Sequence, residues 1–306
     1  MKGIRPLPVV FLIILALLAA ACQASQPQTP TLPAASPQPS STPGPSPTST
    51  LTPTATATPE PLAAQVNGQG ITLAEYNEEL ASYRISRGAA ELTAEEQTSV
   101  LDTLIAEELL AQAARANGFT LAGEAFEARL QNLVESAGGE AAFDAWLEAN
   151  GYSQPVFRLL LKRSAEAAWM RDQIAAEVPL QAEQLRARQV LLYNSSEAQQ
   201  IAARLQGGTD FATIAAEYDP FSLGDLGWFP RGYLLEPAVE EASFALQPGE
   251  VSGIIETRLG FHFVQVTERE PARELAPDAL RVLQQAAVQA WVEEQRSSAA
   301  IQLLLP

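Results

Sequence analysis

The chemistry open to this chain is limited by the residues it lacks. The sequence contains one histidine, His262, and one cysteine, Cys22, among 306 residues. A single cysteine excludes an internal disulfide, and a single histidine excludes a histidine-rich metal site. A serine hydrolase would have to use His262 as its base, and no Gly-x-Ser-x-Gly segment accompanies it. Because HExxH, P-loop and Rossmann glycine patterns are also missing, the sequence predicts no metal site and no cofactor.

A turn-rich segment precedes this histidine. Residues 224–229 read Gly-Asp-Leu-Gly-Trp-Phe, and the two glycines bracket a tight turn before a short apolar strand. Pro237 can occupy the first turn of a helix whose apolar face includes Val239 and Leu246. Taken as a local pattern, the segment predicts a small unit of helices and strands.

The identities along residues 224–246, with Gly-Phe-His at 260–262, resemble the parvulin family of peptidyl-prolyl cis-trans isomerases. That resemblance implies rotation about the peptide bond before proline, against a barrier of about 18–20 kcal/mol, with no covalent intermediate. Such catalysis needs an apolar slot for the proline ring, removal of water from the amide, and polar groups suited to the twisted carbonyl. One histidine and one acid can therefore suffice.

The resemblance also assigns the polar groups of the site, residue by residue. His262 matches the second of the family's two histidines, and Asp219 matches the acid at the start of the loop before Gly224. Gln189 stands where the first histidine is usual, so that position keeps hydrogen-bonding capacity but cannot titrate. Thr257 matches a further polar position.

The proline slot is assigned in the same way. Leu226 and Leu234 match its apolar positions, and Ala238 stands where the family usually has phenylalanine. Losing that ring would enlarge the slot and remove apolar contact worth about 1–3 kcal/mol. The ring of Phe261, or that of Phe263, is the candidate to replace it against the substrate.

An α+β fold is expected for the isomerase, which we place at residues 181–270. Its elements are predicted in the order β-α-α-β-α-β-β, which is the parvulin layout of a small antiparallel-rich sheet wrapped by helices. The predicted strands and helices are a strand at 187–193, helices at 194–205 and 211–218, the strand and helix of the turn-rich segment, and strands at 253–256 and 261–267.

A helical lobe is predicted on either side of this insertion, at residues 63–180 and 277–298. It opens with an Asn67-Gly68 hairpin turn and two capping boxes that begin at Thr72 and Thr93. The opening segment and the run at 101–109 resemble SurA-like and PrsA-like chaperone modules, which implies that the C-terminal helix returns to pack on the N-terminal helices. The other helices are predicted at 122–136, 140–149 and 154–176.

The N-terminal region is predicted to export and tether the protein. Residues 1–21 combine a basic start with an apolar run, which is typical of a signal peptide, and Ala-Ala-Ala before Cys22 resembles a lipoprotein cleavage site. Residues 22–62 are rich in Pro, Ser and Thr and predict a disordered stalk, extended at about 3 Å per residue. The net charge of −17 argues against a nucleic-acid partner.

Together these features predict a foldase anchored through Cys22 to the extracytoplasmic face of a bacterial cell membrane. Its partners would be the bilayer and unfolded secreted polypeptides that contain X-Pro bonds; a homodimer through the helical lobe stays open. One alternative is a holdase chaperone whose parvulin unit has weak or no turnover, which Gln189 and Ala238 favour. Another is a non-catalytic scaffold lipoprotein of the cell envelope.

Overall fold

The computed structural model describes residues 60–305. The predicted signal peptide, the lipidation site at Cys22 and the stalk up to residue 59 lie outside the described residues. The described chain forms two compact units: residues 60–105, 121–162 and 300–305 make the first, and residues 106–120 and 163–299 make the second. Within residues 60–305 no helix combines the length and apolar composition needed to cross a membrane.

A three-stranded antiparallel sheet, ordered β2-β1-β7, belongs to the first unit. The predicted hairpin joins β1 (Leu62–Val66) to β2 (Gln69–Thr72), and Asn67 and Gly68 both have the positive φ that this tight turn requires. The third strand, β7 (Ile301–Leu303), pairs with β1 from the far end of the chain. The sequence pattern did not predict it, because three residues carry no readable periodicity.

Helices make up the remainder of the first unit and continue into the second. Both predicted capping boxes are present, since Thr72 exchanges hydrogen bonds with Glu75 and Thr93 does so with Glu96. The unit boundary falls within α3 and within α6. The helices are α2 (Leu73–Arg87), α3 (Ala94–Ala116), α4 (Gly123–Ser136), α5 (Glu140–Ala149) and α6 (Gln154–Ala176).

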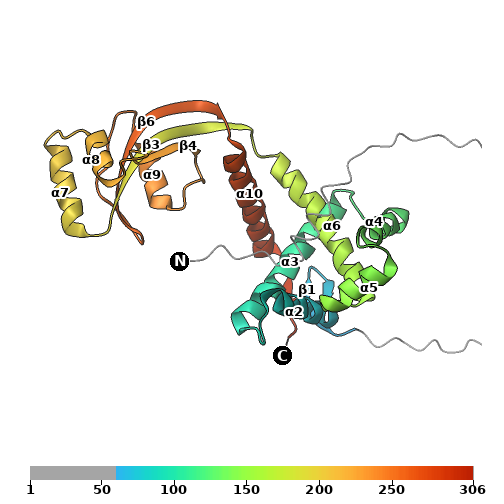
Figure 1. Ribbon diagram of the computed structural model, residues 1–306. Helices are drawn as coiled ribbons and strands as arrows, with labels where there is room; N and C mark the ends of the chain where they lie inside the picture. Colours follow the sequence, from blue (N-terminus) through green and yellow to red (C-terminus); the bar gives the residue numbers. More distant parts are fainter. Residues whose placement is uncertain (1–59, 306) are drawn as a thin grey trace, which may run out of the picture. The chain divides into compact units, whose positions relative to one another are not determined.

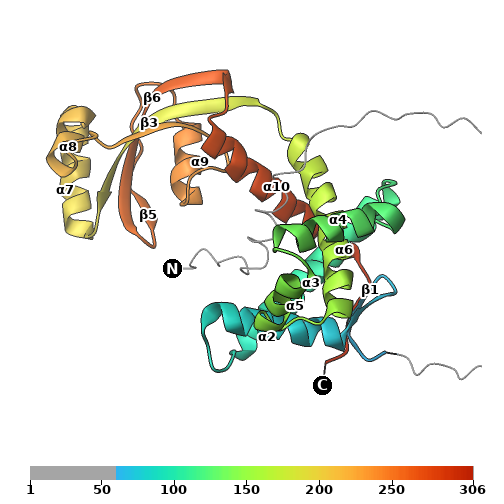
Figure 2. The ribbon, with the colours of Figure 1, turned by 45° about the vertical axis from the view of Figure 1, so that its right-hand side comes forward.

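A four-stranded antiparallel sheet, ordered β4-β3-β6-β5, lies in the second unit. Figures 1 and 2 show two helices against one of its faces and a third against the other. The predicted order β-α-α-β-α-β-β and the α+β class are confirmed. Two strands are longer than the sequence predicted, namely those at 181–192 and 260–274. The elements are β3 (Gln181–Leu192), α7 (Ser195–Gln206), α8 (Phe211–Tyr218), β4 (Asp225–Pro230), α9 (Pro237–Ala245), β5 (Ile255–Thr257) and β6 (Gly260–Glu274).

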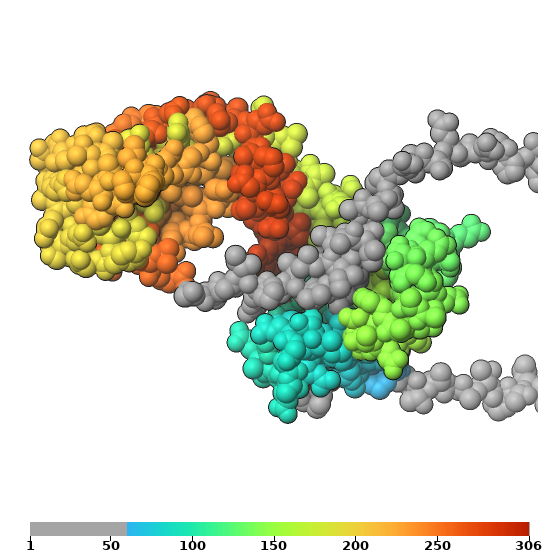
Figure 3. Space-filling view, in the orientation of Figure 1, coloured from blue at the N-terminus to red at the C-terminus, as the bar shows by residue number. Residues whose placement is uncertain are grey.

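Strand alternation divides the side chains of this sheet between two cores. Val190 and Leu192 of β3 join Phe263 of β6 in packing against α7 and α8. In the space-filling view, the yellow and yellow-orange atoms of these two helices lie together at the left (Figure 3). Leu185 and Val264 face the opposite way, toward α9. Odd-numbered residues 187–191 of β3 and even-numbered residues 262–266 of β6 therefore share the α9 face.

The C-terminal helix α10 (Pro277–Ser298) packs on helices that precede the sheet in the chain. Its Val288 and Trp291 contact a cluster formed by Leu110 of α3 with Ala167 and Ile174 of α6, all within the second unit. The predicted return of this helix onto the N-terminal helices is therefore confirmed.

Candidate active site

His262 is a buried residue of β6 and lies between two strands. It pairs in register with Leu191 of β3 and Ile255 of β5, and it is only 1% exposed. Its Nε2 atom lies 2.7 Å from the hydroxyl oxygen of Thr257, so the structure brings two of the predicted polar residues together. Nδ1 has no hydrogen-bond partner within residues 60–305.

Burial disfavours the charged form of this imidazole. It lowers the pKa of His262 below the usual 6.5, while the carboxylate of Glu236 acts weakly in the opposite direction. A neutral imidazole offers one donor and one acceptor nitrogen. The Thr257 hydroxyl oxygen also accepts the N–H of Leu259 at 3.1 Å. The hydroxyl is therefore held from two sides, and it is the half-exposed member of the pair.

Gln189 lies on β3, on the same face of the sheet as His262, and is half-buried. Its backbone N–H donates to the carbonyl of Gly224 at 2.8 Å. A side chain at position 224 would place its Cβ 2.2 Å from the Gln189 carbonyl oxygen, and φ there is +70°. Only glycine fits this approach, so Gly224 holds the loop before β4 against the β3 edge.

Asp219 caps the end of α8 and organises the loop that follows. Its carboxylate accepts the hydroxyl of Ser222 and the backbone N–H groups of Phe221, Ser222 and Gly224. These bonds, led by the Ser222 hydroxyl, lower the pKa of Asp219. The carboxylate is therefore ionised and directed into its own loop.

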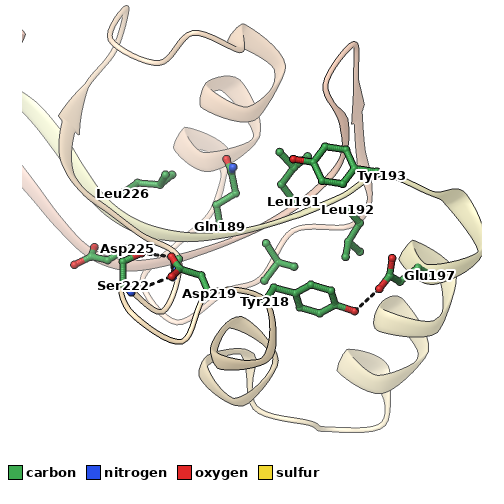
Figure 4. A pocket seen from close by; sticks show the side chains of 12 residues that line it. Gln189, Leu191, Leu192, Tyr193, Glu197, Tyr218, Asp219, Ser222, Asp225 and Leu226 are labelled. Carbon is green, nitrogen blue, oxygen red and sulfur yellow. Dashed lines mark hydrogen bonds between the residues drawn. The ribbon is translucent and has the colours of Figure 1, made fainter.

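A hollow of about 440 Å³ runs along the edge of β3. Three predicted site residues, Gln189, Asp219 and Leu226, line it together. Figure 4 shows Gln189 and Leu226 on one side of β3, and Tyr218 with Glu197 on the other. The remaining lining residues are Val190, Leu191, Leu192, Tyr193, Ser222, Gly224 and Asp225.

The predicted proline slot is assembled only in part. Leu226 and Leu234 pack, half-buried, on the α9-side core around Phe229. Ala238 is exposed, and its neighbour Val239, 1% exposed, is the α9 residue in that core. The assignment of Ala238 to the slot is therefore corrected by one position, since helical geometry turns adjacent side chains about 100° apart.

Phe261 does not lie at the slot. It packs against the cluster under α7 and α8, and Phe263 belongs to that cluster as well. Both rings lie on the far face from His262, because side chains alternate along β6. Neither ring replaces the missing phenylalanine, so the expectation for Phe261 is wrong.

Glu240 is a site-shaping residue that the sequence reading did not identify. Its carboxylate accepts the backbone N–H groups of Gly232, Tyr233 and Leu234 at 2.7, 3.0 and 3.0 Å. The turn that carries Leu234 is thereby tied to α9. An acid in the first turn of a helix that begins with Pro237 was the available signal.

Comparisons with known proteins agree with this architecture. Residues 184–268 match the family model of the PPIC-type PPIASE domain, and residues 48–170 match that of the SurA-like N-terminal domain. The foldase protein PrsA of Caldanaerobacter subterraneus is 28% identical over 233 residues, which cover 67% of this chain and 72% of that protein. The foldase protein PrsA of Geobacillus kaustophilus is 30% identical over 185 residues, which cover 56% of this chain and 62% of that protein.

Solved structures of similar proteins include the peptidylprolyl isomerase PrsA of Bacillus anthracis. It is 21% identical, with 63% of this chain and 88% of that chain covered and a TM-score of 0.41. The sequence matches carry the assignment by themselves. The chain therefore carries a PpiC-type peptidyl-prolyl isomerase domain and a SurA-like N-terminal domain, and it is similar in sequence to foldase proteins PrsA.

Proposed function

We propose that this chain catalyses cis-trans isomerisation of X-Pro peptide bonds in unfolded, secreted polypeptides. The observation that carries the proposal is the buried His262, whose Nε2 atom lies 2.7 Å from the hydroxyl oxygen of the half-exposed Thr257. It lies on the sheet face that also carries Gln189. Neutral polar groups beside apolar surface suit an amide that rotates without being protonated or cleaved.

Each group has a role in this proposal. The proline ring lies against Leu226 and Leu234, which exclude water from the amide and so favour the twisted, less polar form. Gln189 offers its carboxamide to the substrate backbone, and Thr257 offers its hydroxyl. His262 is too deeply buried for direct contact, so it acts as a positioning residue that orients the Thr257 hydroxyl.

A holdase without turnover is the second candidate, and two observations favour it. Gln189 places an amide, which cannot titrate, where the family usually has a histidine. Asp219 is the only acid assigned to the site, and its carboxylate accepts hydrogen bonds from the hydroxyl and N–H groups of its own loop. In that case unfolded clients would bind at the same surface, and their X-Pro bonds would isomerise at the uncatalysed rate, tens to hundreds of seconds.

Thr257→Val tests the isomerase, because it removes the hydroxyl and keeps the shape. We expect kcat/KM on a proline-containing tetrapeptide to fall about tenfold, equivalent to about 1.4 kcal/mol of transition-state stabilisation. Thr267→Val is the matched control: its hydroxyl bonds the Arg186 carbonyl, away from His262, and turnover should change less than about twofold.

Absence of turnover in the unaltered protein would reject the isomerase. If the protein then still suppressed aggregation of an unfolded client, the holdase would be supported. If it neither turned over peptide nor suppressed aggregation, the non-catalytic scaffold lipoprotein of the cell envelope would be the remaining alternative.

We also propose that the chain is tethered to the outer face of the cell membrane through lipidated Cys22. The support is the run of small residues before Cys22 and the apolar stretch ahead of it. Several acyl chains on one residue give durable attachment, which a single chain does not. Cys22→Ser should abolish labelling by a radioactive fatty acid and shift the protein from the membrane fraction; retention of the label would contradict lipidation at this residue.

A further inference from the structure

The β3 strand has a free edge beside the active site. β4 pairs with β3 only from Gln184 to Arg188, and Gly224 then reaches Gln189 before the chain turns away. The last residues of β3 continue to pair with β6 as far as Leu192. On the β4 side, the edge between Gln189 and Leu192 therefore opens on the 440 Å³ hollow.

Backbone alternation decides which groups point into this hollow. Gln189 directs its N–H toward Gly224, on the β4 side. Because successive residues of an antiparallel strand point their N–H and C=O groups to opposite edges, Val190 and Leu192 face β6. The Leu191 N–H and C=O face the hollow, at a position where β4 supplies no partner. An unpaired strand edge of this kind is a template for an added strand.

The charged residues that line the hollow are all acidic. Glu197, Asp219 and Asp225 line it, and no lysine or arginine is among its twelve lining residues. Asp225 is paired with Arg186, whereas Glu197 accepts hydrogen bonds from two neutral groups, the Tyr218 hydroxyl at 2.8 Å and the Asn194 amide at 3.3 Å. The end of the hollow beyond Leu191 is thus acidic on the side of β3 that carries Glu197.

We propose that the β3 edge at Leu191 takes up an extended client segment as an additional strand, with a lysine or arginine of that segment beside Glu197. The inference rests on the proposed function, since the client is the polypeptide whose proline occupies the slot at Leu226. Backbone pairing accepts many sequences, which suits unfolded clients, while the acidic end favours segments with a basic residue close to the proline.

Binding of matched peptides to the full chain tests the charge selectivity. Two proline-containing hexapeptides that differ only by Lys or Glu on one side of the proline are compared, with the Lys on each side in turn. We expect the better-placed Lys peptide to bind roughly five- to tenfold tighter than its Glu counterpart, with the difference reduced in 0.5 M salt. Glu197→Gln should remove most of the preference, and Glu217→Gln, which alters a surface acid paired with Arg204, should keep it.

Backbone pairing is tested separately with N-methylated peptides and amide exchange. Methylation of the peptide N–H that bonds the Leu191 carbonyl should weaken binding about tenfold, whereas methylation of the next amide, which points away, should not. Peptide binding should also slow hydrogen exchange at the Leu191 amide. The proposal fails if every N-methyl position is tolerated or if the Leu191 amide is unprotected in the complex.

These outcomes separate the inference from the proposed function. Turnover without Lys preference or Leu191 protection would overturn the added strand and leave the isomerase standing. Lys preference and Leu191 protection without turnover would support the added strand on a holdase. Protection of Leu191 that rises with protein concentration in the absence of peptide would instead assign the edge to a second copy of the chain, and would overturn the proposal.

Discussion

At the scale of single residues, the site depends on an imidazole whose charged form is disfavoured by burial. His262 is buried among the strands, and removal of water disfavours its cationic form. Thr257 is bound to one ring nitrogen, and a neutral ring can serve this hydroxyl as either donor or acceptor. Protonation would make both ring nitrogens hydrogen-bond donors. The charged ring would then hold an Nδ1–H group that has no acceptor within residues 60–305.

The pH dependence of His262 follows from that environment. Its pKa is lowered in the folded state, so above pH of about 6.5 both folded and unfolded forms are neutral and stability is at its full value. As the pH falls below about 6.5, the unfolded chain binds a proton that the folded chain resists, and stability declines until the folded-state pKa is passed. Urea unfolding at pH 8, 6 and 5 should show this decline, and His262→Gln should flatten it.

The same titration can be observed directly, because the chain has one histidine. The imidazole resonances of the folded protein should titrate below the usual 6.5, and turnover should fall with the same midpoint. An imidazole that titrates above 6.5 would contradict the account of a desolvated neutral ring.

At the scale of elements, two carboxylates hold the turns that frame the site. Asp219 gathers the loop between α8 and β4, and Glu240 gathers the turn between β4 and α9. In each case one side chain satisfies several backbone N–H groups that no strand or helix could pair. The positions of Gly224 and Leu234 follow from these two anchors, and so does the shape of the surface offered to proline.

Glu240→Gln should therefore loosen the Leu234 turn without disturbing the sheet. An amide has one acceptor oxygen and cannot accept the three N–H groups that the carboxylate accepts. We expect KM for proline peptides to rise about three- to tenfold, with a smaller change in kcat. The free energy of unfolding should fall by about 1–2 kcal/mol. Steady-state kinetics and urea unfolding measure the two effects.

The neighbouring Glu241→Gln provides the control, since Glu241 is exposed on the same helix. It should leave the free energy of unfolding within about 0.5 kcal/mol of the unaltered protein, and KM within the equivalent factor of about two. Equal effects of the two substitutions would show that the loss of charge on α9, and not the anchoring of the turn, is responsible.

At the scale of the whole molecule, the segments before and after the isomerase both contribute to the first unit, at residues 60–105 and 300–305. β7 pairs with β1, and Asn67 exchanges hydrogen bonds with Ala300. In the second unit, α10 packs on α3 and α6. An ion-pair network links those two helices: Arg115 bridges Glu108 and Glu166, and Arg163 also pairs with Glu108.

Deletion of residues 300–306 should destabilise the sheet of the first unit and leave the isomerase activity of the second unit intact. It removes β7 and leaves β1 and β2 as a two-stranded hairpin, which is marginally stable by itself. We expect amide exchange in β1 and β2 to accelerate at least about tenfold, while protection of β3 and β6 and turnover of short peptides are retained. A deletion of residues 305–306, which spares β7, is the control; loss of peptide turnover in the longer deletion would contradict this expectation.

Local sequence determined much of this protein. Asn67-Gly68, the capping boxes at Thr72 and Thr93, and Pro237 at the start of α9 mark element boundaries through chemistry confined to a few neighbouring residues. The order of strands and helices and the family followed from such local signals and from the Gly-Asp-Leu-Gly run. The ranges of the domains stay predictions, since the compact units divide α3 and α6 instead of following them.

Tertiary structure decided which side chains meet. Ala238 and Phe261 looked suitable by type, yet α9 turns Val239 inward and the alternation along β6 sends Phe261 to the far core. The free edge at Leu191 and the anchoring by Glu240 depend on where β4 leaves β3 and on which backbone groups remain unpaired. A sequence carries residue types and local periodicity, but the face that a side chain occupies and the partner it finds depend on register and packing between distant segments.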